Sequence, residues 1–175
     1  MSLRICAALI ALALLVAADG TAAGGASNDG AAAVMPSASQ SSEVAIIVSP
    51  KNPARDISFD ALRKYFKAER GQWPDGTKVV VAMRQPAGQP ERAAVLRSIY
   101  GWDEGYYQKY FRQGNFNESI QSVPKELNTT YAMLQYVHYT PGAIGYVRAD
   151  QADASKVTIL SVDGRRPGEG GYRIK

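Results

Sequence analysis

The residue with the clearest chemical potential is Arg84, which directly follows the apolar run Lys78 to Met83. That run predicts a buried strand. The polar loop after Arg84 leads to Pro90, a residue suited to the first position of a helix. The first N–H groups of a helix have no partner within it, and together with a guanidinium they favour an anion. The pattern predicts that any anion contact centres on Arg84; the alternative is a solvated loop arginine.

Other side chains that could support catalysis or metal binding lack the necessary companions. His138 is the only histidine and lies near the end of a predicted helix, where a favourable contact with the helix dipole is the simpler interpretation. Cys6 is the only cysteine, so no set of zinc ligands can be assembled. The sequence contains no Gly-x-Ser-x-Gly elbow, Walker loop or dinucleotide-binding glycine motif. We therefore expect no enzymatic activity, no metal and no cofactor.

The tyrosines Tyr106, Tyr107 and Tyr110 allow two interpretations. Their rings could stack on a sugar or a peptide. Their helical spacing is more simply explained by packing against the core and its rim.

Composition and charge limit the classes of partner. The 175 residues are 46% hydrophobic and 21% charged, values typical of a globular protein. The net charge of +4 favours an anionic ligand or surface only mildly. No clustered basic stripe or known nucleic-acid module is present, so nucleic-acid binding is not expected.

The first 42 residues are not expected to join the fold. Met1 to Arg4 is a short positive start, Ile5 to Ala18 is an uncharged apolar run, and small residues follow. This pattern predicts a cleaved signal peptide over residues 1–23 and export to the periplasm. A membrane anchor is the alternative, but the run is shorter than the ~20 residues that a spanning helix needs. Residues 24–42, rich in Ala, Gly and Ser, predict a flexible leader before a domain over residues 43–175.

The order of predicted elements in this domain indicates an α/β fold. Apolar runs predict strands, and residues that cap or open helices separate them. Strands are expected at 44–48, 79–83, 144–147 and 157–160, and helix starts at Ser58, Pro90, Asp103 and Thr129. Strands that alternate with helices imply a layered domain with a largely parallel or mixed sheet.

The most specific motif is Thr140-Pro141-Gly142-Ala143-Ile144-Gly145-Tyr146-Val147. It predicts a helix stop, a turn and a strand, and Gly145 within the strand suggests close approach by another element. This stretch resembles the PGAIGYV signature of the phosphate-type solute-binding proteins of ABC transporters. Further stretches resemble the same family in order and spacing, at 57–66, 73–77, 79–84 and 161–164. The resemblance implies a periplasmic-binding-protein-like (type II) single lobe, a mixed sheet flanked by helices.

The resemblance also implies a ligand and a site. In the family, an arginine at the end of the second strand and a Ser-Gly-Thr turn at a helix start bind phosphate. Arg84 keeps the arginine position, but the turn is Ala87-Gly88-Gln89-Pro90, without both hydroxyls. The implied ligand-binding residues are thus Arg84, Gly88 and Gln89, with phosphate or a similar small oxyanion as ligand.

The implied partners are an ABC permease or a membrane sensor. Full-length members of the family close two lobes on the anion, whereas this chain matches mainly one. A second copy in a homodimer, or another partner, could supply the missing half of the cleft. The alternative function is an interaction module in the periplasm that retains a degenerate anion site.

Overall fold

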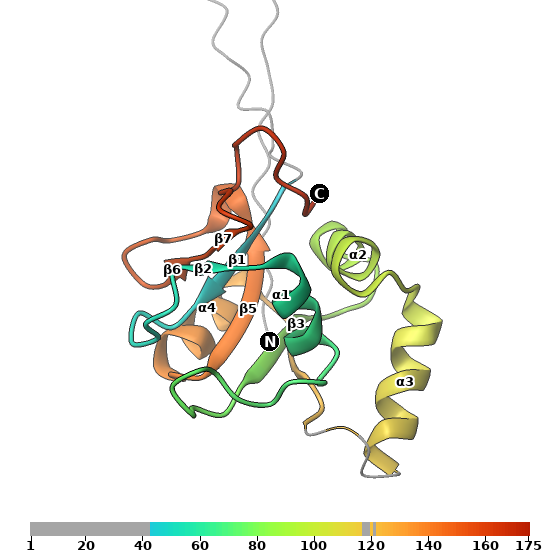
Figure 1. Cartoon of the computed structure of the whole chain (residues 1–175). Coiled ribbons are helices and arrows are strands. Elements are labelled where there is room, and N and C mark those ends of the chain that lie inside the picture. The colour runs from blue at the N-terminus through green and yellow to red at the C-terminus, as the bar shows by residue number, and fades with distance from the viewer. Residues whose placement is uncertain (1–42, 117–119, 121) are drawn as a thin grey trace, which may run out of the picture. The chain divides into compact units, whose positions relative to one another are not determined.

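The structure is a computed structural model that describes residues 43–116, 120 and 122–175 (Figure 1). The predicted signal peptide and leader lie outside the described residues. Within the described part, the main sheet has the strand order β4-β3-β5-β1-β6. Its strands are β1 (Val44–Val48), β3 (Val80–Arg84), β4 (Lys125–Leu127), β5 (Ala143–Arg148) and β6 (Thr158–Ile159).

The sheet is mixed, as predicted. Strand β3 runs parallel to both β4 and β5, whereas β1 runs antiparallel to β5 and β6. The three strands expected at 44–48, 79–83 and 144–147 are all confirmed, and β3 extends by one residue to include Arg84. The α/β class with a mixed sheet is therefore confirmed.

The strand expected at 157–160 is confirmed only over Thr158–Ile159, and the chain then passes to a second sheet. β6 joins the main sheet, and after Leu160 the chain continues as β7 (Ser161–Val162), which pairs in parallel with β2 (Asp56–Ile57). The Leu160 amide donates to the Ile46 carbonyl at 2.9 Å, and the Ser161 amide donates to the Arg55 carbonyl at 3.1 Å. Consecutive residues thus bond to different sheets, which a continuous apolar run does not reveal.

The helices begin where the capping residues predicted. They are α1 (Phe59–Phe66), α2 (Pro90–Val95), the π-helix η1 (Leu96–Tyr100), α3 (Glu104–Phe116), α4 (Thr130–Tyr139) and the short 3-10 helix η2 (Ala149–Gln151). The Ser58 hydroxyl accepts from the Ala61 amide, and the Thr129 hydroxyl accepts from the Ala132 amide. No helix among the described residues is long and apolar enough to cross a membrane.

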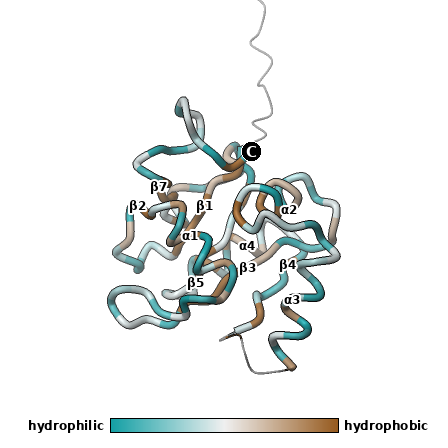
Figure 2. The backbone as a smooth tube through the Cα atoms, turned by 45° about the vertical axis from the view of Figure 1, so that its right-hand side comes forward, coloured by the Kyte–Doolittle hydropathy of each residue, from teal (hydrophilic) through white to brown (hydrophobic). Residues whose placement is uncertain are grey.

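Strand β1 is buried on both faces of the sheet and divides the core in two. Val44, Ile46 and Val48 belong to the larger cluster, which includes side chains of α1, α2, η1 and α3. Ala45 and Ile47 belong to the smaller cluster, which includes side chains of α4. Successive side chains of a strand point to opposite faces, so an unbroken apolar run fits a strand covered on both sides (Figure 2).

Two glycines of the 140–147 motif permit close packing. A Cβ atom on Gly142 would lie 1.9 Å from the Lys78 carbonyl oxygen. A Cβ atom on Gly145 would lie 2.7 Å from the Met133 Sδ atom and 3.2 Å from the Val137 Cγ2 atom, both on α4. The close approach predicted at Gly145 is confirmed, and α4 is the element that packs there.

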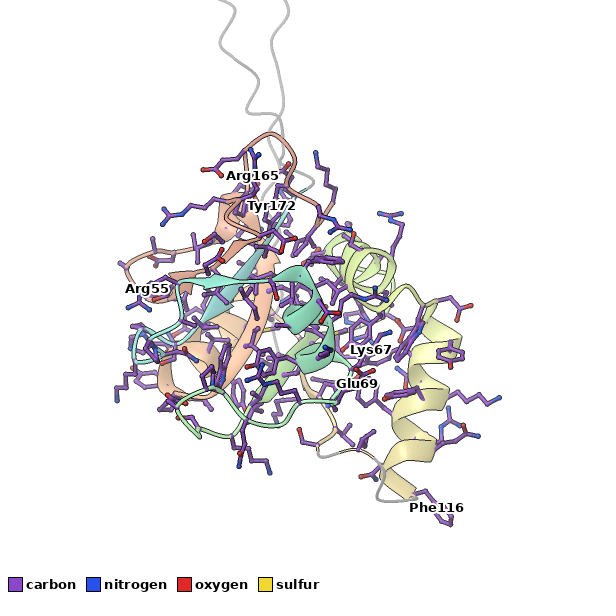
Figure 3. All side chains as sticks on the ribbon, viewed as in Figure 1. Arg55, Lys67, Glu69, Phe116, Arg165 and Tyr172 are labelled. Carbon is purple, nitrogen blue, oxygen red and sulfur yellow. The ribbon has the colours of Figure 1, made fainter. Side chains whose placement is uncertain are left out.

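Helix α3 is attached mainly through aromatic side chains. Tyr107 and Phe111 are buried in the larger cluster, and the Tyr110 hydroxyl donates to the Lys67 carbonyl at 3.1 Å. Trp102, just before the helix, packs against Tyr110 with the ring planes tilted by 47° and the ring centroids 4.6 Å apart. At the other end of α3, Phe116 is 87% exposed and projects away from the sheet (Figure 3).

Candidate anion-binding site

The C-terminal ends of β3, β4 and β5 meet at one edge of the sheet because the three strands run parallel. At this edge β3 ends at Arg84 and β5 ends at Arg148, while α2 follows β3 and α4 follows β4. Open α/β sheets bind ligands outside the carboxyl ends of their strands. The fold therefore places the predicted site where this class of sheet offers one.

Arg84 is buried, which corrects the expectation of a solvated loop arginine. It is the last residue of β3 and only 7% exposed. Its amide donates to the Tyr146 hydroxyl at 3.1 Å, and its carbonyl accepts from Arg92 Nη1 at 2.6 Å. Its own Nε and Nη1 groups have no hydrogen-bond partner. The expectation failed because it counted Arg84 as part of the loop, whereas the strand carries it into the interior.

Gly88 and Gln89 form the approach to α2. Gly88 has a φ of +92°, a backbone conformation that favours glycine. Gln89 is the N-cap of α2 but makes no side-chain capping bond, and Pro90 is the first helical residue. The first backbone bond into the helix runs from the Ala93 amide to the Gln89 carbonyl. Since Pro90 has no N–H, the turn offers fewer donors than an ordinary helix start.

Glu91 is a site residue that the sequence interpretation missed. It is the second residue of α2, is 6% exposed, and places its Oε1 atom 3.5 Å from Arg84 Nε. An acidic residue in the first helical turn has an ordinary explanation in the helix dipole. No local signal indicates that its carboxylate faces an arginine seven residues earlier.

Arg148 is the second missed residue, and it ends β5 at the same edge. Its Nε and Nη2 groups donate to the Asp150 carboxylate. The hydrogen bond that Arg148 donates to Asp150 raises the pKa of Arg148, and the negative charges of Asp150 and Glu91 add to this effect. Glu91 therefore acts electrostatically on both arginines at this edge.

Arg92, next to Glu91 in α2, has a structural role instead. Its side chain is fully buried, and Nε and Nη2 each donate to the Glu104 carboxylate at 2.8 Å. Burial opposes its charge most strongly, but the hydrogen bond and charge of Glu104 still raise the pKa of Arg92. The same hydrogen bond lowers the pKa of Glu104. Its three hydrogen bonds leave Arg92 little capacity for a ligand.

The remaining candidates have structural partners. His138 lies in the last turn of α4, and its Nδ1 atom is 2.6 Å from the Lys156 carbonyl oxygen. Tyr107 is buried, and the Tyr106 and Tyr110 rings pack against Trp102 in tilted contacts, as packing along a helix predicts. Among the described residues, no group of three or more His, Cys, Asp or Glu side chains could hold a metal.

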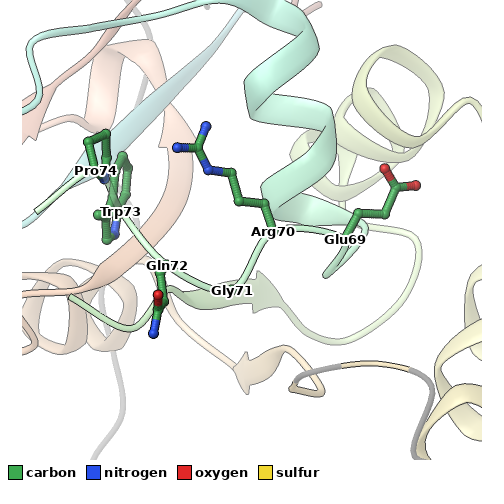
Figure 4. A pocket seen from close by; sticks show the side chains of 6 residues that line it. All are labelled: Glu69, Arg70, Gly71, Gln72, Trp73 and Pro74. Atoms are coloured by element: carbon green, nitrogen blue, oxygen red, sulfur yellow. The ribbon is translucent and has the colours of Figure 1, made fainter. Parts of the chain in front are cut away.

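A pocket of about 530 Å³ lies away from Arg84, before the start of β3 (Figure 4). Its lining residues are Glu69, Arg70, Gly71, Gln72, Trp73 and Pro74. The Arg70 guanidinium lies over the Tyr65 ring, 5.3 Å from its centroid. Arg70 is exposed and unconnected to the edge that carries Arg84, which makes it a useful reference residue in tests of the site.

Comparison with known proteins supports the class that the fold defines. The phosphate transport receptor of Vibrio cholerae superposes with a TM-score of 0.58 at 16% identity, over 71% of this chain and 48% of that one. PstS from Borrelia burgdorferi gives 0.54 at 17% identity, over 71% and 49%. The predicted periplasmic-binding-protein-like lobe is confirmed as a fold.

Sequence comparison then identifies a more particular relative. The chain is 28% identical over 127 residues to the phosphate-binding protein PstS of Bacillus subtilis, covering 71% of this chain and 37% of that protein. No family model matches. The predicted resemblance to phosphate-type solute-binding proteins is thus confirmed, and the chain spans less than half the length of these relatives.

Proposed function

We propose that this chain is an exported solute-binding domain that binds phosphate or a similar small oxyanion, with Arg84, Gly88 and Gln89 as ligand-binding residues. One observation carries the proposal: Arg84 is buried at the C-terminal end of β3, and two of its N–H groups have no hydrogen-bond partner. An unsatisfied buried donor costs about 1–3 kcal/mol, and more when it is charged. An oxyanion that accepts from these groups would recover that free energy.

The names of the similar proteins support a role in transport rather than catalysis. Their names describe a phosphate-binding protein and a phosphate transport receptor, not enzymes. The proposed partners are accordingly an ABC permease or a membrane sensor in the periplasm. Because the chain spans 37% of the PstS sequence, a second copy or a partner protein would complete the cleft.

A second candidate function is an interaction module with a degenerate anion site. The turn at Ala87-Gly88-Gln89-Pro90 lacks the two hydroxyls expected from the family resemblance. Glu91 also supplies Arg84 with an internal counter-charge at 3.5 Å. Both features weaken an anion site, whereas neither disturbs a surface used for contact with a protein.

Calorimetric titration with phosphate and sulfate tests the proposal. We expect the wild type to bind one of the two anions and Arg84→Gln to lose roughly ten- to a hundredfold in affinity, the value of one charge-assisted hydrogen bond of about 1.5–3 kcal/mol. Arg70→Gln is the matched control and should bind like the wild type. Circular dichroism must show that both variants are folded.

The outcomes separate the two functions. A wild type that binds neither anion would favour the interaction module. Equal affinities for the wild type and Arg84→Gln would place the anion elsewhere, and a loss only in Arg70→Gln would assign it to the pocket of Figure 4. Both Arg84→Gln and Arg84→Ala remove the charge that faces buried Glu91, at a cost on the order of 3 kcal/mol. Arg84→Gln is the better choice, because its side-chain amide can still donate a hydrogen bond to the Glu91 carboxylate.

A further inference from the structure

We infer that Glu91 is an internal competitor for Arg84, so that an oxyanion binds at this edge only at the expense of the Arg84–Glu91 ion pair. The inference rests on the proposed function and adds the residue that sets the affinity of the same site. It starts from the position of Glu91, a buried carboxylate at the start of α2 that faces the end of β3. Its carboxylate therefore occupies the side of Arg84 to which an external anion would also be attracted.

The contact between the two side chains is an ion pair without a hydrogen bond. Arg84 Nε and Glu91 Oε1 are 3.5 Å apart, and the side chains are 8% and 6% exposed. Neither Nε nor Nη1 of Arg84 is satisfied as a donor. Glu91 thus supplies the charge that Arg84 needs for burial but leaves its directional bonding capacity unused.

Arg92 provides the contrast that makes Arg84 the exchangeable arginine. Its guanidinium makes two hydrogen bonds of 2.8 Å to Glu104 and a third, of 2.6 Å, to the Arg84 carbonyl. An external anion would have to break these bonds to reach Arg92. At Arg84, an anion would instead make hydrogen bonds that are absent without it.

The charges at this edge already balance. Arg84 faces Glu91, and Arg148 is paired with Asp150. Glu91 also contributes to the raised pKa of Arg148, so its charge extends to both cations. An incoming anion therefore meets no surplus positive charge, and Glu91 repels it directly. A substitution that removes the Glu91 charge but keeps the shape of the side chain should therefore strengthen anion binding at Arg84.

The test compares phosphate affinity in Glu91→Gln with that of the wild type by calorimetric titration. We expect Glu91→Gln to bind phosphate at least about tenfold more tightly, a gain of about 1.4 kcal/mol. Glu69→Gln is the matched control, since Glu69 is exposed on the turn before β3 and its loss should leave affinity unchanged. Combining Arg84→Gln with Glu91→Gln should cancel the gain, because Arg84 supplies the unused donors to which the anion binds.

A second variant tests the inference even if Glu91→Gln fails to fold. Glu91→Asp keeps the charge but withdraws the carboxylate from Arg84, and we expect a smaller gain in phosphate affinity. If Glu91→Gln is unstable alone, phosphate should raise its unfolding temperature by more than it raises that of the wild type.

Two results would overturn the inference. A wild type that binds phosphate, with Glu91→Gln equal or weaker, refutes competition but leaves the proposed function intact. Absence of phosphate binding in the wild type and in all Glu91 variants refutes both.

Discussion

At the scale of single residues, the buried arginines Arg84 and Arg92 differ in how far their hydrogen-bond donors are satisfied. Arg92 joins α2 to two other elements. It donates to Glu104, the first residue of α3, and to the Arg84 carbonyl at the end of β3, and its guanidinium lies 4.9 Å from the centroid of the Tyr107 ring of α3. Arg84 instead meets one carboxylate and retains unused donors. We therefore assign Arg92 to stability, whereas Arg84 remains the residue proposed for ligand binding.

Arg92→Lys should destabilise the protein although it keeps the charge. A lysine ammonium cannot reproduce the two parallel bonds to Glu104 together with the bond to the Arg84 carbonyl. We expect a loss of about 2–4 kcal/mol in the free energy of unfolding, since a buried hydrogen-bonded pair is broken. Urea denaturation measures this loss, and Arg166→Lys on the exposed C-terminal segment is the control. Equal stability of Arg92→Lys and the wild type would contradict the assignment.

The site could be predicted from the sequence only in part. The end of an apolar run placed Arg84 at a strand terminus, and Pro90 marked the following helix start, because both signals are local. The contact of Glu91 with Arg84 and the arrival of Arg148 at the same edge depend on how the strands align. Such pairings are set by tertiary packing and leave no mark in spacing or composition.

At the scale of elements, the junction of β3 and β5 depends on a glycine. Gly142 lies just before β5, and its carbonyl accepts both from the Val80 amide and from the Trp73 indole. A side chain at this position would collide with the Lys78 carbonyl, which is backbone and cannot turn aside. The helix stop and turn predicted by the motif thus also hold two strands together.

Gly142→Ala should therefore destabilise the fold more than Gly145→Ala. At Gly145 the added methyl meets the Met133 thioether and the Val137 side chain, of which the thioether is flexible. We expect Gly145→Ala to cost about 1–3 kcal/mol, as overpacking usually does, and Gly142→Ala to cost more. Thermal unfolding of the two variants gives the order. A smaller effect at Gly142 would show that the β3–β5 junction can move apart.

Elements with strong local signals were predictable, and short ones were not. Ser58, Pro90 and Thr129 mark helix starts as expected, because capping depends on the residue itself. β2 and β4 have two and three residues and are stabilised by pairing with distant strands. Lys125–Leu127 has no apolar run, so it becomes a strand only beside β3.

At the scale of the whole molecule, the sequence predicted a single lobe. The length of chain that superposes on the similar structures agrees with this prediction. The match covers 71% of this chain but less than half of each similar structure described above. The mixed sheet, buried on both faces, needs no second lobe to form its core. A complete ligand cleft, in contrast, requires a second surface that faces the sheet edge carrying Arg84.

Export is the prediction that belongs to the chain as a whole. The chain begins with a positively charged segment and an apolar run, and small residues follow. This pattern predicts that the first residues are removed during secretion. Mass spectrometry of protein isolated from the cell envelope should find a new N-terminus between Asp19 and Ala26. Envelope protein that still begins at Met1 would contradict cleavage and favour the membrane-anchor alternative.

The surroundings of the two tryptophans give the molecule two separate optical reporters. Trp73 is 4% exposed, and its indole N–H donates to the Gly142 carbonyl at 3.0 Å. Trp102 is partly exposed and packs against Tyr106, and its ring centroid lies 4.8 Å from the Lys67 ammonium. A soluble quencher such as acrylamide should therefore dim the fluorescence of Trp102 well before that of Trp73. Release of α3 and opening of the β3–β5 junction can then be followed as distinct signals in one unlabelled sample.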